Sequence, residues 1–143
     1  MPDKVREQCI QYVKDSQEAN GAFRYTKRGG HTTFALTAAG VVSLFSAGIY
    51  EGDQVERGLK YIRENRDDVP DHYYFYGHYY AVQAMWHAGG KLWNDWYPWI
   101  RDNLLKMQDR AGVWSSPYGE EFGTAMACII LQMPKDRLPI FAK

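Results

Sequence analysis

Apolar residues follow two different helical patterns along this chain, and their alternation limits the folds open to it. Three segments, at about 3–17, 53–65 and 94–112, carry apolar side chains on one stripe at helical spacing. The three segments between and after them, at about 32–47, 74–88 and 119–132, are apolar almost all round. A helix with one apolar stripe can face water, whereas a helix that is apolar on all sides has to be covered. The pattern therefore predicts an all-α fold of three α-hairpins in two layers.

These hairpins recur at a period of roughly 45 residues, which is typical of repeat arrays. We expect residues 1–143 to form a single repeat domain, with repeats at about 3–48, 53–90 and 94–133. We expect the tail, 134–143, to pack back on this body. No segment has the pattern of a strand, so residues 23–30 are predicted to be a loop. Pro98 is expected in the first turn of its helix, where a missing N–H is tolerated.

Charge and composition argue against several classes of function. The formal net charge is zero and like charges do not cluster, so a sequence-independent nucleic-acid binder is not expected. No apolar run is long enough to span a membrane, and the polar first residues do not resemble a signal peptide. The four histidines lack metal-ligand spacing, so we expect neither a metal nor a cofactor. Cys9 and Cys128 fall in apolar helical stretches and are expected to be buried free thiols. The cellular compartment stays open.

A short motif occurs twice between an amphipathic and an apolar segment. The stronger copy is Gln108, Gly112 and Trp114, and the weaker copy is Gln17, Gly21 and Phe23 at the same spacing. Glycine suits the left-handed backbone at a helix end, and an amide can satisfy polar groups left without partners there. A wide aromatic face suits packing between helices. We therefore assign these six residues structural roles.

Two stretches of the sequence together resemble the QW repeat of squalene and oxidosqualene cyclases. Arg57-Gly58-Leu59-Lys60-Tyr61-Ile62 followed by Arg66 matches the front half of that repeat, and Gln108 with Gly112-x-Trp114 matches the back half. The repeat is shared more loosely with β subunits of protein prenyltransferases and with bacterial prenyltransferase and squalene-oxidase-repeat proteins. The resemblance implies an α/α toroid in which glutamine and tryptophan join neighbouring outer helices. Three hairpins would form half of such an (α/α)6 barrel.

Several departures from the family bear on activity. Hopene-type cyclases use an Asp-x-Asp-Asp motif, whereas this chain has Asp67-Asp68-x-x-Asp71. Neither cysteine has the preceding aspartate of the prenyltransferase zinc set, and the thioester sequence of complement-type toroids is missing. A half ring leaves an apolar edge. The chain is then a segment of a longer protein, associates with a second copy, or curls enough to stand alone.

The richest cluster of functional side chains is the aromatic stretch from 71 to 80. Tyr76, Tyr79, Tyr80 and Gln83 share a face at helical spacing, and His78 has the pKa range of a general acid or base. Such a face can bind an apolar or carbohydrate ligand, or it can simply fill a wide gap between helices. The ligand-binding candidates are Tyr76, His78, Tyr79, Tyr80 and Gln83, and the weak catalytic candidates are His78, Tyr76 and Tyr79.

The sequence favours a non-catalytic binding or scaffold segment of a larger squalene-cyclase-like protein. Its partners would be a second copy or the remaining repeats of a parent chain. The alternative is an isoprenoid cyclase-, transferase- or polysaccharide lyase-like enzyme that uses the Tyr/His cluster, an idea based on analogy between folds.

Overall fold

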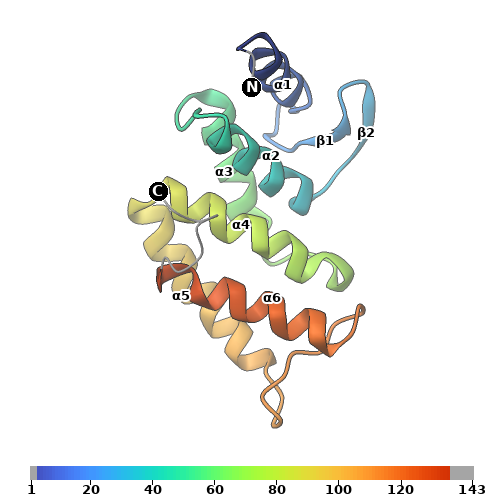
Figure 1. The fold of residues 1–143 in the computed structure, drawn as a ribbon, viewed down its shortest axis with the longest axis vertical. Coiled ribbons are helices and arrows are strands. Elements are labelled where there is room, and N and C mark those ends of the chain that lie inside the picture. The colour runs from blue at the N-terminus through green and yellow to red at the C-terminus, as the bar shows by residue number, and fades with distance from the viewer. Residues whose placement is uncertain (1–2, 136–143) are drawn as a thin grey trace. The chain divides into compact units, whose positions relative to one another are not determined.

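The computed structural model describes residues 3–135, which are mostly helical (Figure 1). Its helices are α1 (Asp3–Asp15), α2 (Phe34–Ser46), α3 (Asp53–Glu64), α4 (Tyr74–Ala88), α5 (Gly90–Met107) and α6 (Glu120–Gln132). Short 3-10 helices, η1 (Asp71–Tyr73) and η2 (Met133–Lys135), adjoin α4 and α6. The predicted order of helices is confirmed, while the toroid arrangement stays a prediction. The predicted docking of the tail falls on 136–143, outside the described residues.

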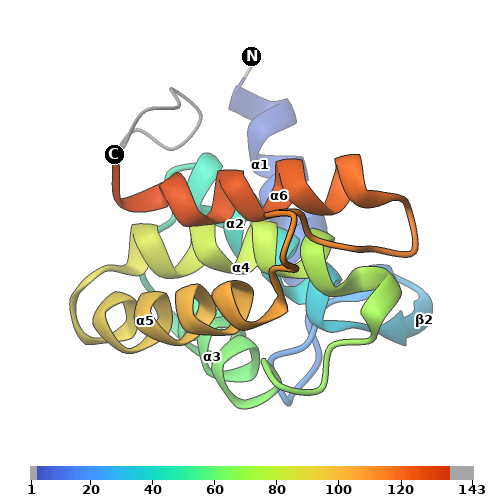
Figure 2. The same ribbon diagram turned by 90° about the horizontal axis from the view of Figure 1, so that it is seen from below.

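The chain divides into two compact units, residues 1–68 and 69–143. In the first unit α2 contacts α1 and α3, and in the second unit α4 contacts α5 and α6 (Figure 2). The boundary falls inside the predicted second repeat, 53–90, because α3 packs with the first unit and α4 with the second. The single repeat domain over residues 1–143 stays a prediction.

The first unit is built on the apolar helix α2. Thr33 begins this helix, since its side-chain oxygen accepts a hydrogen bond from the Leu36 N–H (3.1 Å). The predicted stripe of α3 is buried, with Val55, Leu59 and Ile62 at 2%, 7% and 0% exposure. Gly58 lets α3 approach α2 closely, because a Cβ there would lie 2.5 Å from Val41 Cγ2. The buried set of α2 is Phe34, Ala35, Thr37, Ala38, Val41, Leu44 and Phe45.

The core of the second unit lies where α4 meets its two neighbours. It contains Phe75, Ala81, Val82, Ala84 and Met85 from α4, Trp96, Ile100 and Leu104 from α5, and Ala127 and Ile130 from α6. The prediction that α6 is buried all round is wrong. Ala125 is exposed and Phe122, Met126 and Ile129 are half-buried, because α4 covers one side of α6 within this unit.

The segment predicted to be a loop, 23–30, contains a small antiparallel hairpin instead. Strands β1 (Arg24–Thr26) and β2 (Gly29–Thr32) pair with an irregularity near Arg24. The hairpin closes through the Thr26 hydroxyl, which donates to the Gly29 carbonyl (2.7 Å). Strands this short and polar carry no alternating apolar pattern, so periodicity does not reveal them.

Helix α5 begins earlier than predicted, which places Pro98 inside the helix rather than in its first turn. Gly89 and Gly90 adopt positive φ angles of 67° and 51°, so α5 starts directly after α4 ends. The Lys91–Asp95 ion pair (2.7 Å) has the helical i,i+4 spacing and supports the first turn.

Helix α1 is the least covered helix, and it also corrects a prediction about the thiols. None of its residues is buried. Of its predicted apolar stripe, Val5 (43%), Cys9 and Tyr12 (49%) are exposed and Val13 is half-buried. Cys9 is exposed and Cys128 half-buried, and both are free thiols. The prediction of buried thiols is wrong because an apolar stripe is buried only where another element covers it.

Candidate functional site

The first glutamine turn, residues 17–23, is held by hydrogen bonds to its own backbone. Gln17 Nε2 donates to the Gly21 carbonyl (3.1 Å), and Asn20 Oδ1 accepts from the Ala22 N–H (3.0 Å). Gly21 has φ 92°, the left-handed region that glycine adopts readily. The turn ends at Phe23, which is 3% exposed and donates its N–H to Thr37 Oγ1 in α2 (3.0 Å).

The second glutamine turn, residues 108–114, repeats these contacts. Gln108 Nε2 donates to the Gly112 carbonyl (2.9 Å), and Asp109 Oδ1 accepts from the Ala111 N–H (2.8 Å). Gly112 has φ 85°. Trp114 is 4% exposed and donates its N–H to Thr124 Oγ1 in α6 (3.1 Å). The six residues assigned structural roles therefore form two turns with matching geometry.

Trp114 has an additional anchor that Phe23 lacks. Its indole Nε1 donates to the Leu104 carbonyl in α5 (2.7 Å). This bond satisfies the polar atom of a buried ring and joins the turn to the helix before it. The second turn is thus held to both of its flanking helices.

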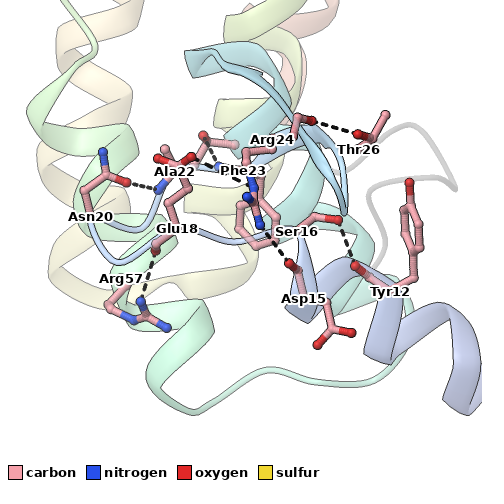
Figure 3. Close-up of polar contacts among 12 residues, drawn as sticks. Tyr12, Asp15, Ser16, Glu18, Asn20, Ala22, Phe23, Arg24, Thr26 and Arg57 are labelled. Atoms are coloured by element: carbon pink, nitrogen blue, oxygen red, sulfur yellow. Dashed lines mark hydrogen bonds and ion pairs between the residues drawn. The ribbon is translucent and has the colours of Figure 1, made fainter.

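The two turns differ in what covers them. Gln17 Nε2 also donates to the Gln54 carbonyl in α3 (2.8 Å), and Arg57 donates to the Glu18 carbonyl (3.1 Å, Figure 3). A Cβ added at Gly21 would collide with the Arg57 carbonyl. In the second turn, residues 109–112 are exposed, and the nearest atom to a Cβ on Gly112 is Gln108 Nε2 at 3.7 Å. Among the described residues of its unit, no helix takes the place of α3.

The Tyr/His cluster of α4 contains both buried and exposed side chains. His78 is fully buried among aromatic rings, with ring-centre distances of 4.4 Å to Tyr74, 5.5 Å to Trp99 and 6.0 Å to Trp96. Burial lowers the pKa of His78 to about 3, so its imidazole is neutral at pH 7. Gln83 is also buried, and its amide donates to the Tyr79 carbonyl within the same helix (2.9 Å).

An open aromatic pocket of about 390 Å³ lies beside the start of α4. Its lining residues are His72, Tyr73, Tyr76, Tyr118 and Phe122. Of the predicted ligand-binding residues, Tyr76 belongs to this pocket, whereas His78, Tyr79, Tyr80 and Gln83 are not among its lining residues. Tyr76 is 45% exposed, and its ring packs edge-to-face on that of Tyr80 (5.1 Å between ring centres). Partial burial raises the pKa of the Tyr76 hydroxyl above its ordinary value.

Sequence reasoning missed the residues that the next hairpin contributes to this pocket. Tyr118 and Phe122 pack edge-to-face (5.6 Å), but they lie more than 40 positions from Tyr76 in the chain. Their only sequence signal is the aromatic character of the loop and of the first turn of α6. A second pocket of about 480 Å³ is lined by Asp71, Tyr74, Phe75, Met107, Ser115, Ser116 and Pro117.

Neither a metal site nor a membrane span is found in the part of the chain that the structure describes. Over residues 3–135, no group of three or more His, Cys, Asp or Glu side chains is placed to hold a metal ion. None of the described helices combines the length and apolar character needed to cross a bilayer.

No family model, curated protein or solved structure matches this chain.

Proposed function

We propose that this chain is a non-catalytic scaffold segment of a helical-repeat protein of the squalene-cyclase-like kind. In this proposal the glutamine turns hold successive hairpins together. The observation that carries it is the hydrogen bond from Gln17 Nε2 to the Gln54 carbonyl (2.8 Å). This bond joins the turn of one hairpin to the first helix of the next, while the same amide nitrogen binds the Gly21 carbonyl inside the turn.

The contacts around this amide favour a general scaffold over a single accidental bond. Gln17 binds backbone carbonyls, which every helix offers irrespective of its side chains. Arg57 returns from α3 to the Glu18 and Ala19 carbonyls of the turn (3.1 and 3.4 Å). A repeat protein needs such sequence-tolerant contacts, because each repeat binds mainly its neighbours.

The enzymatic alternative has less support. General acid–base catalysis requires a group that reaches the substrate and titrates near the working pH. His78 has no exposed surface, and burial moves its pKa to about 3. Of the other catalytic candidates, Tyr76 lines the aromatic pocket, whose lining residues include neither His78 nor Tyr79.

Hydrogen exchange tests the scaffold proposal. Replacing Gln17 with alanine should increase amide exchange in α3 by about tenfold, because it removes the bond that ties the turn to this helix. Gln11→Ala is the matched control, since Gln11 is exposed on α1 and bonds to Asp15 within its own helix (2.6 Å). Unchanged exchange in α3 of Gln17→Ala would contradict the proposal.

Activity assays test the enzymatic alternative directly. We expect no conversion of squalene, farnesyl diphosphate or a uronate polysaccharide by the intact chain. Conversion that Tyr76→Phe or His78→Phe abolishes, but Tyr25→Phe leaves unchanged, would support the enzyme instead. Tyr25 is a suitable control because it is 72% exposed on β1 and outside the cluster.

A second candidate function, binding of an apolar or carbohydrate ligand, is favoured by the aromatic pocket. Its lining is almost entirely aromatic, and ring faces suit either a polyene or the apolar face of a sugar. NMR titration with farnesol and, separately, with cellotetraose should shift resonances of Tyr76 and Tyr118. Tyr118→Ala should weaken that binding at least tenfold, and Tyr25→Ala should not. Shifts that are absent with both probes, or that persist unchanged in Tyr118→Ala, would contradict this function.

A further inference from the structure

Helix α1 exposes apolar positions that are buried in α5, the helix that precedes the second glutamine turn as α1 precedes the first. Aligning the two glutamine turns places Val5 at the position of Trp96 and Cys9 at the position of Ile100. Trp96 and Ile100 are 1% and 0% exposed because α4 packs against α5. Val5 is 43% exposed and Cys9 is also exposed. Among the described residues of its unit, α1 therefore has no counterpart of α4, the apolar helix that covers α5.

Helix α6 presents the complementary half of such a contact. Thr37 accepts the Phe23 N–H of the first turn, and Thr124 accepts the Trp114 N–H of the second turn. Aligning the two threonines places Val41 at the position of Cys128. The same alignment places Ala38 at Ala125. Val41 and Ala38 are fully buried in the first unit, whereas Cys128 is half-buried and Ala125 exposed. In the first unit α3 covers Val41, and among the described residues of its own unit α6 has no such cover.

The register of α1 matches that of α3, the helix that makes this contact. An aromatic-aliphatic pair occurs in both helices, Tyr12-Val13 in α1 and Tyr61-Ile62 in α3. Cys9 then takes the position of Gly58, a small residue that lies against Val41. Because Cys128 takes the position of Val41, the same packing would bring Cys9 against Cys128.

We propose that α1 of one copy of this chain packs on α6 and on the second glutamine turn of another copy, as α3 packs on α2 and the first turn. This inference rests on the proposed scaffold function and names its partner. The two uncovered faces are the two halves of one type of contact, and each chain carries both. Copies therefore satisfy each other head to tail, in a heterologous interface that closes into a ring or extends into a chain.

The packing of α3 on α2 and on the first glutamine turn also specifies the polar contacts of the proposed interface. Gln108 occupies the place of Gln17, so its amide would donate to a backbone carbonyl of the docked α1 near Val5, the counterpart of Gln54. Gln8 occupies the place of Arg57 and would donate to carbonyls of the exposed turn. Gly112, where a Cβ would touch only Gln108 Nε2 at 3.7 Å, would accept the close approach that Gly21 shows.

Cysteine crosslinking between two single variants tests this interface. Cys9→Ser keeps only Cys128, and Cys128→Ser keeps only Cys9. With copper phenanthroline and oxygen as the oxidant, the mixture should form a disulfide-linked dimer, because each thiol meets the other from a second copy. Either variant alone should stay uncrosslinked. A dimer formed equally by one variant alone, or no dimer in the mixture, would overturn the proposal.

Solution mass gives a second readout that does not depend on the thiols reacting. The wild-type chain should associate as concentration rises, and Cys9→Arg should lower the association constant at least a hundredfold. Glu7→Arg is the matched control, because Glu7 is exposed on α1 and its counterpart in α5, Pro98, is exposed as well. Equal association of Cys9→Arg and the wild type would overturn the interface.

These outcomes separate the interface from the scaffold function. A strictly monomeric wild-type chain would overturn the proposal that a second copy covers α1 and α6. A further repeat of a longer protein would then be the partner of these two helices. Fast exchange of α3 in Gln17→Ala would then still support the scaffold. Unchanged exchange of α3 in Gln17→Ala would contradict the scaffold function, and with it the contact on which the proposed interface is based.

Discussion

The two glutamine turns share their internal hydrogen bonds and differ in what lies on top of them. Gln17 and Gln108 both hold the carbonyl of the glycine four residues on, and Phe23 and Trp114 are both buried. Helix α3 covers the first turn, whereas residues 109–112 of the second turn are exposed. The motif therefore sets the local geometry of the turn by itself, while the burial of the turn's outer surface depends on a separate helix.

The largest expected effect concerns what the turns share, the buried aromatic ring. Trp114→Ala should lower the free energy of unfolding by about 3–5 kcal/mol, because it leaves a cavity and removes the indole bond to the Leu104 carbonyl. Chemical denaturation measures this. Tyr118→Ala, at a residue 61% exposed, should cost less than about 1 kcal/mol. Equal costs for the two variants would mean that the ring does not anchor the turn.

The glycines measure the difference in cover directly. Both have positive φ angles, 92° at Gly21 and 85° at Gly112, so alanine at either position should cost about 1–2 kcal/mol in backbone strain. Gly21→Ala should cost roughly 1–3 kcal/mol more, because its new Cβ meets the Arg57 carbonyl while that of Gly112→Ala makes an ordinary contact with Gln108 Nε2 at 3.7 Å. Equal losses in denaturation experiments would show that α3 does not press on the first turn.

Because His78 is buried where α4 meets α5, we expect the stability of the fold to depend on pH. Burial lowers the pKa of His78 from 6.5 to about 3, so unfolding takes up a proton below pH 6.5. Stability should be complete above pH 6.5 and fall by up to about 1.4 kcal/mol for each pH unit as the pH drops toward 3. His78→Phe should flatten this slope between pH 6.5 and 5, above the range where most carboxyl groups titrate. An unchanged slope in that variant would show that His78 does not cause it.

The smallest expected effect comes from the glutamines. Gln17→Ala loses two hydrogen bonds and should cost about 1–3 kcal/mol, whereas Gln108→Ala loses one and should cost about 0.5–1.5 kcal/mol. Thermal unfolding of both variants checks the order. A larger loss in Gln108→Ala would indicate that the second turn is also covered in the free chain.

Helix periodicity located most elements closely, since the apolar helices α2, α4 and α6 lie within about two residues of their predicted ranges. The stripe of α3 is buried as predicted, with Ile62 fully enclosed. The hairpin at 24–32 and the early start of α5 escaped prediction. Both depend on glycine backbone angles and on pairing between neighbouring segments, which leave no periodic signal.

The candidate site was less predictable than the helices. The aromatic stretch of α4 is evident in the sequence, yet of its predicted ligand-binding residues Tyr76 alone is among the lining residues of the aromatic pocket, together with Tyr118 and Phe122 from another hairpin. His78 lies two residues from Tyr76 but points into the α4–α5 contact, because a helix rotates by about 200° over two residues.

The sequence alone determined the order of helices, the two turns and the glycines that the turns require, because periodicity and backbone preference act over a few neighbouring residues. Tertiary structure decided which stripes are buried. Helices α1 and α3 carry similar apolar stripes and both contact α2, but α3 buries its stripe while α1 leaves Val5 and Cys9 in solvent. Burial belongs to a pair of surfaces, so a pattern on one helix cannot specify it without the other.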